Sequence, residues 1–376
     1  PLGVSIEACI CMQSIYLDNA ATTPLCEAAA KAMAPYMQAG SAAPFGNANS
    51  LHSVGRRAFS ALEDARARVA RALRAHRPDE IVFTACATES DNSAIVGMAL
   101  GAHEKARLAG KHGPFNIVTS RIEHEAVLET QHMLRALGFE FRFVDNDASG
   151  RVTPDALARA IDENTLVVSV MAANNEVGTI QPTAELCRVA HEAGALFHVD
   201  AVQALGKVPI SLKDWNVDAA SFSAHKVGGP KGVGVLYLAA KTPYVAYMPG
   251  GGQEGGRRSG TQNVCGIVGA AAAIEFAVAE QPAYAQRARA MPRRHKARGA
   301  IGRGAGGKRG FPAQYRECVR ARFRKPDAHL AARHARHLRV GRLGLRVREP
   351  RSVTCAFRAR RRAGACPRRA ARVYRR

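Results

Sequence analysis

The segment with the clearest potential for chemistry runs from Ser221 to Gly234. In it a strand-like stretch ends near Ser223 and His225, Lys226 follows, and a Gly/Pro-rich turn leads into another strand-like stretch. A lysine amine held at a strand end and partly removed from water can attack a carbonyl compound and form a Schiff base. Ser223 and His225 could bind a phosphate beside it. A His-Lys pair in a glycine turn is more often plain surface, so this segment needs support from others.

Three further candidates follow strand-like stretches or open helices. Asp200 and Gln203 come after the apolar run at 195–199, and an aspartate there can pair with a protonated ring nitrogen. Thr88 opens a helix whose backbone N–H groups could seat a phosphate. His124 could stack on a ring. Each has an ordinary alternative, which is helix capping for Asp200 and Thr88 and a packing role for His124.

Two loops complete the set of polar candidates. Asn174 and Asn175 offer amides after another strand-like run, and the Gly-rich loop from Gly250 to Thr261 carries paired arginines that could cradle an anion. Ligands of α/β proteins bind at the carboxyl ends of the strands. We therefore expect these candidates to meet at one edge of one sheet.

The elements that position them follow from the apolar pattern. The helical spacing of the apolar residues from Val54 to Leu73 predicts a helix there. Residues 13–18 look like the start of a first strand. Seven further apolar runs predict buried strands, at 81–83, 116–119, 141–144, 166–171, 195–199, 219–223 and 233–238. Helical segments separate most of them, which predicts a three-layer αβα fold with a mainly parallel sheet.

The basic excess of the chain lies in its last quarter. The net charge is +23. Residues 281–376 contain 30 Lys and Arg against 3 Asp and Glu, whereas residues 1–280 contain 24 against 28. The first part therefore has the mildly acidic balance of an ordinary enzyme, and nucleic acid is not an expected partner. By composition alone, the Arg-rich part would be a disordered tail.

The remaining composition indicates a cytoplasmic protein. The nine cysteines are scattered and odd in number, which argues against a disulfide framework. Cys9 and Cys11 have no second pair nearby, so no metal site is expected. Residues 1–11 lack the features of a secretion signal, and we expect them to be a non-native or read-through leader before Met12. No stretch is expected to span a membrane.

Seven motifs stand in an order that belongs to one known family. They are Y-L-D-N-A-A-T-T-P at 16–24, A-T-E-S at 87–90, E-H at 123–124, N-N-E-V-G at 174–178, H-V-D at 198–200, S-A-H-K at 223–226 and R-S-G-T at 258–261. The set resembles the fold-type I, class V aminotransferases, and more narrowly the NifS-like cysteine desulfurases. These enzymes use pyridoxal 5′-phosphate (PLP). The resemblance covers about residues 14–280.

The resemblance implies a role for each candidate. Lys226 would hold the cofactor covalently, His124 would stack on its ring and assist proton transfer, and Asp200 would pair with the pyridine nitrogen. Thr261 would reach the phosphate of a neighbouring subunit, which implies a homodimer. Cys86 stands where relatives usually have glycine and is not expected to be the nucleophile. The full set of expected cofactor-binding residues is Ala87, Thr88, His124, Asn175, Asp200, Gln203, Ser223, His225, Lys226 and Thr261.

Relatives also carry a smaller domain with a loop like S-x-G-S-A-C-x-S-G, whose cysteine attacks the substrate sulfur. Residues 281–376 contain no such loop. Read one base later with degenerate codons, residues 339–357 can encode S-A-G-S-A-C-A-S-G-S-P-E-A-S-H-V-L, and residues 312–320 can encode L-P-N-T-A-N-V-S. We therefore expect a change of reading frame between about Ala285 and Arg293. The chain would comprise a leader at 1–11, a PLP-binding large domain at 12–285 and an out-of-frame Arg-rich tail at 286–376, with the small domain lost or disordered.

The sequence thus predicts a PLP-dependent cysteine desulfurase that converts L-cysteine to L-alanine. Its sulfur would pass to an iron–sulfur scaffold or another acceptor protein. Activity of the chain as written would be absent or impaired, because the persulfide-forming loop is missing. Two alternatives stay open: selenocysteine lyase or another class V enzyme, and a non-enzymatic pseudogene product or basic nucleic-acid-binding protein.

Overall fold

The computed structural model describes residues 16–40 and 44–290. Its strands are β1 Ile81–Thr84, β2 Asn116–Ser120, β3 Glu140–Val144, β4 Thr165–Ser169, β5 Leu196–Asp200, β6 Ala219–Ser223 and β7 Gly234–Leu238. Its α-helices are α1 Glu27–Met33, α2 Ser53–Leu73, α3 Ala87–Leu108, α4 Glu125–Leu128, α5 Thr130–Ala136, α6 Pro154–Ala160, α7 Thr183–Glu192, α8 Leu212–Trp215 and α9 Val264–Ala290. Short 3₁₀ turns are η1 Ala34–Tyr36, η2 Pro78–Glu80, η3 Ala224–Lys226 and η4 Gln253–Gly256.

All seven strands expected from the apolar runs between 81 and 238 are present. They form one sheet in the order β1-β7-β6-β5-β4-β2-β3. β3, β2, β4, β5 and β6 are mutually parallel, whereas β7 runs antiparallel to both β6 and β1. The prediction of a mainly parallel sheet is confirmed.

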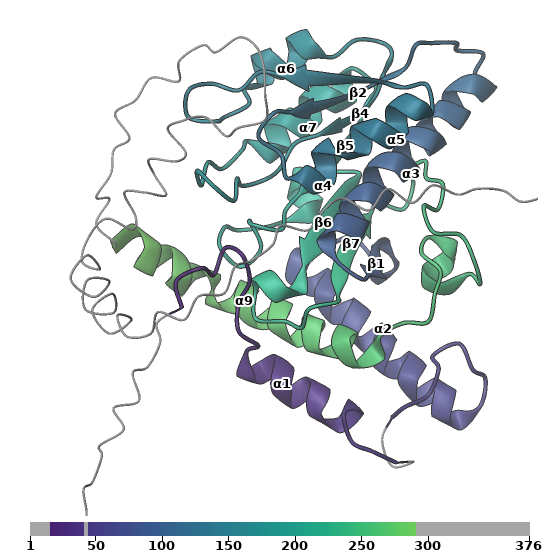
Figure 1. Cartoon of the computed structure of the whole chain (residues 1–376), viewed down its shortest axis with the longest axis vertical. Coiled ribbons are helices and arrows are strands. Elements are labelled where there is room, and N and C mark those ends of the chain that lie inside the picture. Colours follow the sequence, from purple (N-terminus) through teal and green to yellow (C-terminus); the bar gives the residue numbers. More distant parts are fainter. Residues whose placement is uncertain (1–15, 41–43, 291–376) are drawn as a thin grey trace, which may run out of the picture. The chain divides into compact units, whose positions relative to one another are not determined.

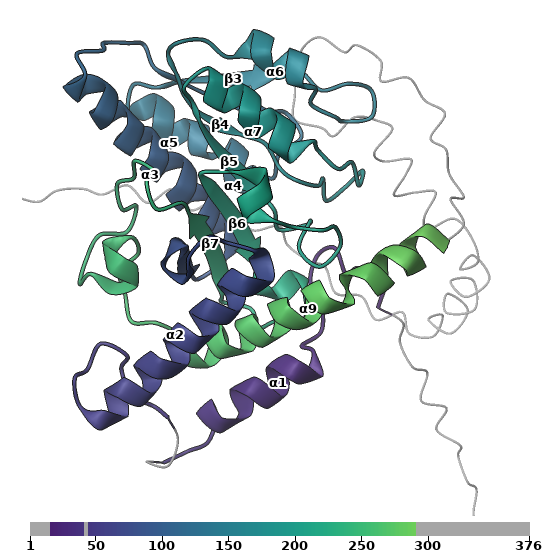
Figure 2. The same cartoon turned by 180° about the vertical axis from the view of Figure 1, so that it is seen from behind.

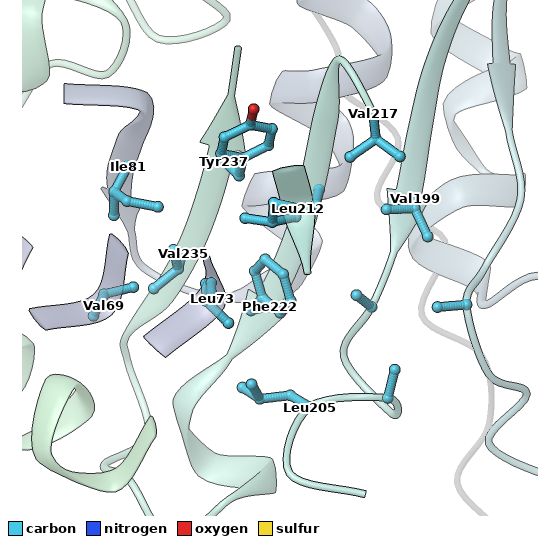
Figure 3. Close-up of a cluster of buried hydrophobic side chains, with 14 of the residues drawn as sticks. Val69, Leu73, Ile81, Val199, Leu205, Leu212, Val217, Phe222, Val235 and Tyr237 are labelled. Atoms are coloured by element: carbon cyan, nitrogen blue, oxygen red, sulfur yellow. The ribbon is translucent and has the colours of Figure 1, made fainter. Parts of the chain in front are cut away.

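Helices cover both faces of the sheet, as the continuous apolar strands require. One core contains α2, α7 and α9 residues together with Val199, Phe222 and Val235 from the strands, and Figure 3 shows part of it. The other core packs α3 against the opposite face, through residues such as Ile95 and Leu236. Figure 1 shows α3, α4 and α5 in front of the strands, and Figure 2 shows α6 and α7 from behind. The three-layer αβα architecture is confirmed.

The helix expected at 54–73 is α2. Its apolar positions Ala58, Leu62, Val69 and Leu73 are buried, while the residues between them are mostly more exposed. Arg74 ends the helix in the left-handed conformation, with φ 54°. α2 and α1 both contact α9, and the three helices lie together in both views.

One expectation from the sequence is wrong, and one finding was not expected. The described part of the expected first strand, residues 16–18, forms no strand and leads into a turn. The residues that follow it form hydrogen bonds to loops instead. The Thr23 amide donates to the His225 carbonyl, and the Gln203 side chain donates to the Ala20 carbonyl. The unexpected finding is that α9 is long and apolar enough to cross a membrane, by length and composition alone. However, 56% of its most apolar window is buried and the helix packs on α1 and α2, as core helices do.

Some sequence expectations lie outside the described residues. These are the leader at 1–11 and the Arg-rich tail, apart from residues 286–290. α9 extends through Ala290, so one helix crosses the expected domain boundary at 285.

Candidate functional site

The polar candidates converge at the carboxyl edge of the parallel strands. β5 ends at Asp200, and β6 ends at Ser223 just before the turn that holds Lys226. His124 follows β2 and caps α4. Burial raises the pKa of the Asp200 carboxyl, and His124 and Lys226 both lie close enough for their charges to oppose that rise. The structure therefore brings together the expected lysine, acid and histidine.

The Lys226 amine is half-buried and held by backbone. Its Nζ donates a hydrogen bond to the Ala20 carbonyl at 2.6 Å. Burial lowers the pKa of Lys226, while the carboxylates of Asp200 and Asp18 oppose that shift. The neutral amine is the form that attacks an aldehyde, and a lowered pKa makes that form more abundant.

Asp200 is buried, with 5% of its surface exposed. One oxygen, Oδ1, accepts a hydrogen bond from the Val202 amide at 2.9 Å. Burial raises the pKa of Asp200, and the Val202 amide, His124 and Lys226 counteract it. The Val202 bond is of the capping type, and it opens a series of turns rather than a regular helix, so a capping role for Asp200 stands beside the cofactor role.

The N-terminus of α3 fits a phosphate. Its N-cap Cys86 makes no side-chain capping bond, and Thr88 lies inside the first turn, so the N-capping alternative for Thr88 is wrong. The buried Ser223 hydroxyl has no hydrogen-bond partner among the described residues. Gly234 on β7 lies against the backbone of Cys86, at the N-terminus of α3. A Cβ at position 234 would lie only 2.5 Å from the Cys86 carbonyl carbon, so this close approach needs a glycine. A long helix with an uncapped N-terminus beside an unpaired hydroxyl suits a bound anion.

The two histidines are oriented by neighbours on one ring nitrogen each. His124 Nδ1 accepts from the Ala126 amide at 3.0 Å, which places the proton of the neutral ring on Nε2. His225 Nδ1 lies 3.1 Å from the Thr22 hydroxyl. Burial and the charges of Lys226 and Lys231 lower the pKa of His225. Both rings therefore keep Nε2 for another partner.

The remaining candidates lie around this centre. Gln203 donates to the Ala20 carbonyl at 3.0 Å and accepts from Lys207 Nζ at 2.5 Å, so its amide has a fixed orientation. Asn175 is half-buried, whereas the neighbouring Asn174 is structural, since its Oδ1 accepts from the amides of residues 176 and 177. Thr261 is exposed on the Gly-rich loop.

The Gly-rich loop differs from the expected anion cradle. Arg258 is paired with Glu89 at the start of α3, at 2.6 Å, and is not available as a separate cation. Glu254 is buried in the middle of the loop and binds Arg66 of α2 at 2.7 Å. The loop is thus anchored to the domain by two ion pairs.

Sequence reasoning missed the role of residues 20–26. Thr23 Oγ1 donates to the His225 carbonyl at 2.8 Å and accepts from the Gly228 amide at 2.7 Å. The Cys26 amide donates to the Gly228 carbonyl at 2.8 Å. This N-terminal segment therefore fastens the turn that presents Lys226. The Thr-Thr pair was visible in the sequence, but nothing local indicated its partners some 200 residues away.

We expect Thr23→Val to lower the free energy of unfolding by about 1–2 kcal/mol, because it leaves the amide of the buried Gly228 without its acceptor. Thr23→Ser keeps the hydroxyl and is the matched control, with a smaller loss. Urea unfolding of the three proteins measures both effects. Equal stability of the parent and the valine variant would show that the segment does not fasten the turn.

The chain matches known proteins over the same region. The aminotransferase class-V family model matches residues 15–325. A cysteine desulfurase IscS of Dictyoglomus turgidum is 45% identical over 268 residues, which are 71% of this chain and 65% of the relative. The chain spans about two thirds of the length of the curated relatives it matches.

Solved structures share the fold. A NifS-like protein is 45% identical with a TM-score of 0.66, and the match covers 72% of this chain and 71% of that one. The structure of SspA in complex with cysteine is 37% identical with a TM-score of 0.62, and the match covers 70% of this chain and 72% of that one.

Proposed function

Because the chain belongs to the class V aminotransferase family, we propose that it binds PLP at the carboxyl edge of its sheet and that Lys226 attaches the cofactor. The observation that carries this proposal is that Lys226 and His124 both lie near the buried Asp200 carboxyl, at the sheet edge where the uncapped helix α3 begins. Enzymes of this family are PLP-dependent. The residues present fit the chemistry of that group.

Each part of the cofactor has matching residues. The first turn of α3, Ala87 and Thr88, with the hydroxyl of Ser223 and His225 Nε2, would hold the phosphate. Asp200 would pair with the ring nitrogen, and Asn175 and Gln203 would contact the ring. Bound there, the cofactor supplies an electron sink for negative charge at a substrate Cα. His124 Nε2 and the Lys226 amine are the groups that can hold or move a proton beside it.

For the substrate we propose L-cysteine, converted to L-alanine with transfer of its sulfur to an acceptor. The names of the matched relatives support this reading over selenocysteine lyase, and the solved SspA structure contains cysteine. We further propose a cytoplasmic homodimer in which Thr261 serves the partner's site. An iron–sulfur scaffold is the acceptor class that the family implies.

Sulfur transfer by this chain depends on a cysteine loop that lies, in relatives, in the smaller domain. Sulfur transfer needs a thiol on the protein, and residues 281–376 contain no loop of the expected S-x-G-S-A-C-x-S-G type. We propose that these residues, which lie outside the described structure except at their start, are read out of frame and that sulfur release is impaired. The coding DNA tests this directly. Early stop codons in the frame one base on from about residue 290 would rule it out.

The attachment site is tested by adding PLP to the purified chain. We expect a visible absorbance band of lysine-bound cofactor in the parent, and none in Lys226→Ala, which lacks the amine. Lys231→Ala removes a nearby exposed lysine and is the matched control, which should keep the band. An unchanged spectrum in Lys226→Ala would refute the proposal.

A further inference from the structure

A layer of buried polar side chains lies next to Asp200, on the sheet face that α3 covers. His198 is two residues before Asp200 on β5, so both side chains point to the same face. Ser221 lies opposite Asp200 in the register of β5 with β6. The carboxyl group of Asp91, from α3, lies close by. The side chains packed next to Asp200 are therefore polar rather than apolar.

Hydrogen bonds connect this layer across three strands. His198 Nδ1 lies 2.8 Å from the Ser169 hydroxyl, and its Nε2 lies 2.9 Å from the Ser221 hydroxyl. Asp91 Oδ1 lies 3.6 Å from the same Nε2. Burial lowers the pKa of His198 to about 3. The ring is therefore neutral and cannot compensate a charge on Asp91.

Glu123, which follows β2, is a third acid of this group. It accepts a hydrogen bond from the Ser120 hydroxyl. Its Oε2 and Asp91 Oδ1 are buried without a hydrogen-bond partner among the described residues, and the two residues are only 7% and 1% exposed. An ionised oxygen without a donor is far more costly in an apolar interior than a neutral one. Both acids are thus in surroundings that favour the protonated form.

The positive groups near the three acids favour ionisation of Asp200. Lys226 of η3 and His124 at the start of α4 both act on the Asp200 carboxyl. Asp91 instead faces the carboxyl groups of Asp200 and Glu123, and Glu123 faces that of Asp200. Like charges at short range disfavour a second ionisation.

We propose that Glu123 and Asp91 are positioning residues that remain protonated at neutral pH, so that Asp200 alone carries the negative charge directed at the cofactor. The role of Asp200 in this statement rests on the proposed function. The protonation of the other two acids does not, since it needs no cofactor. Burial raises the pKa of Glu123 to about 8 and holds the pKa of Asp91 well above its usual range. Hydrogen bonds from Ser120 and the Met171 backbone to Glu123, and from Ser221 to Asp91, oppose these shifts, and the charge of Asp200 adds to both.

The pH dependence follows from the sign of this shift. The folded pKa of Glu123 lies above the unfolded value, so its stabilisation is complete below the unfolded pKa and is lost as pH rises to about 8. Above that pH an ionised Glu123 places a second negative charge beside Asp200. Glu123→Gln cannot ionise. Between pH 5 and pH 9 the midpoint of thermal unfolding of the parent should therefore fall relative to that of the variant, by at least about 2 °C.

Infrared spectroscopy of the full chain without added cofactor tests the proposal. The parent at pH 7 should show a carbonyl band of protonated carboxyl groups, which Glu123→Gln and Asp91→Asn each reduce. Asp79 is an exposed acid, so Asp79→Asn is the matched control and should leave the band unchanged. Absence of the band at pH 7, or a band that neither amide variant reduces, would overturn the proposal.

Two further measurements keep the outcome unambiguous. If an amide variant does not fold, titration of the band in the parent decides: loss of intensity near pH 8 supports the proposal, and a loss completed below pH 6 contradicts it. PLP titration of Asp200→Asn tests the cofactor site separately. Parent-like binding in that variant would refute the role of Asp200, while the infrared result would still report on Glu123 and Asp91.

Discussion

Glu254→Gln is expected to lower the free energy of unfolding by about 3 kcal/mol, since it removes the buried partner of an ion pair and leaves Arg66 only the more exposed Glu63. The Glu254 side chain is fully buried, and Arg66 is nearly so. The pair also completes the edge strand β1. Arg66 donates to the Ile81 carbonyl at 2.6 Å, and the Phe83 amide donates to Glu254 at 2.9 Å. The variant therefore disturbs the outer edge of the sheet as well as the Gly-rich loop.

Asp79→Asn provides the control for that prediction. Asp79 pairs with Arg77 at the similar distance of 2.6 Å, but both side chains are more than half exposed. Exposed pairs contribute about 0–1 kcal/mol, so this variant should unfold almost as the parent does. Denaturant unfolding compares the three proteins. Equal losses in the two variants would show that the Glu254 pair does not anchor the loop.

Asp200→Asn is expected to weaken PLP binding by about 30-fold or more, because losing one partner of a buried charge pair costs about 2 kcal/mol or more. An asparagine keeps the size of the side chain and can still accept from the Val202 amide. It cannot provide the negative charge that a protonated ring nitrogen requires. Titration with PLP, followed by absorbance, measures the change.

The control for this variant is Asp214→Asn. Asp214 is exposed and pairs with Arg74, on the surface of the domain. The Asp214→Asn variant should bind PLP as tightly as the parent does. If Asp200→Asn bound the cofactor as tightly as Asp214→Asn, the ring nitrogen would have no partner at Asp200.

The strands were predictable because each is a short, local apolar run. Phe197, Phe222 and Val235 are buried by any packing of a two-sided sheet, so their type alone marked them as core. The strand order was not predictable in the same way. The antiparallel direction of β7 depends on its pairing with both β6 and β1, and the latter lies some 150 residues earlier.

The candidate site was predictable where chemistry and strand ends coincide. Lys226, Asp200 and Ser223 were singled out from the sequence, and the structure brings them to one edge. The contacts that hold them were not predictable, because Thr23 and Glu254 act on partners about 200 and 190 residues away. The sequence of the Gly-rich loop, with its paired arginines, suggested an exposed anion-binding loop. It gave no sign that Glu254 within the loop is buried.

Chemical trapping of the bound cofactor shows which lysine of the chain holds it. After PLP is bound, borohydride makes the bond to the lysine permanent, and mass spectrometry of the digested protein identifies the labelled peptide. Lys207 is a demanding competitor, since burial lowers its pKa to about 8 and it lies near Lys226. We predict the label on Lys226. A label on Lys207, or one spread over exposed lysines, would rule out attachment at Lys226.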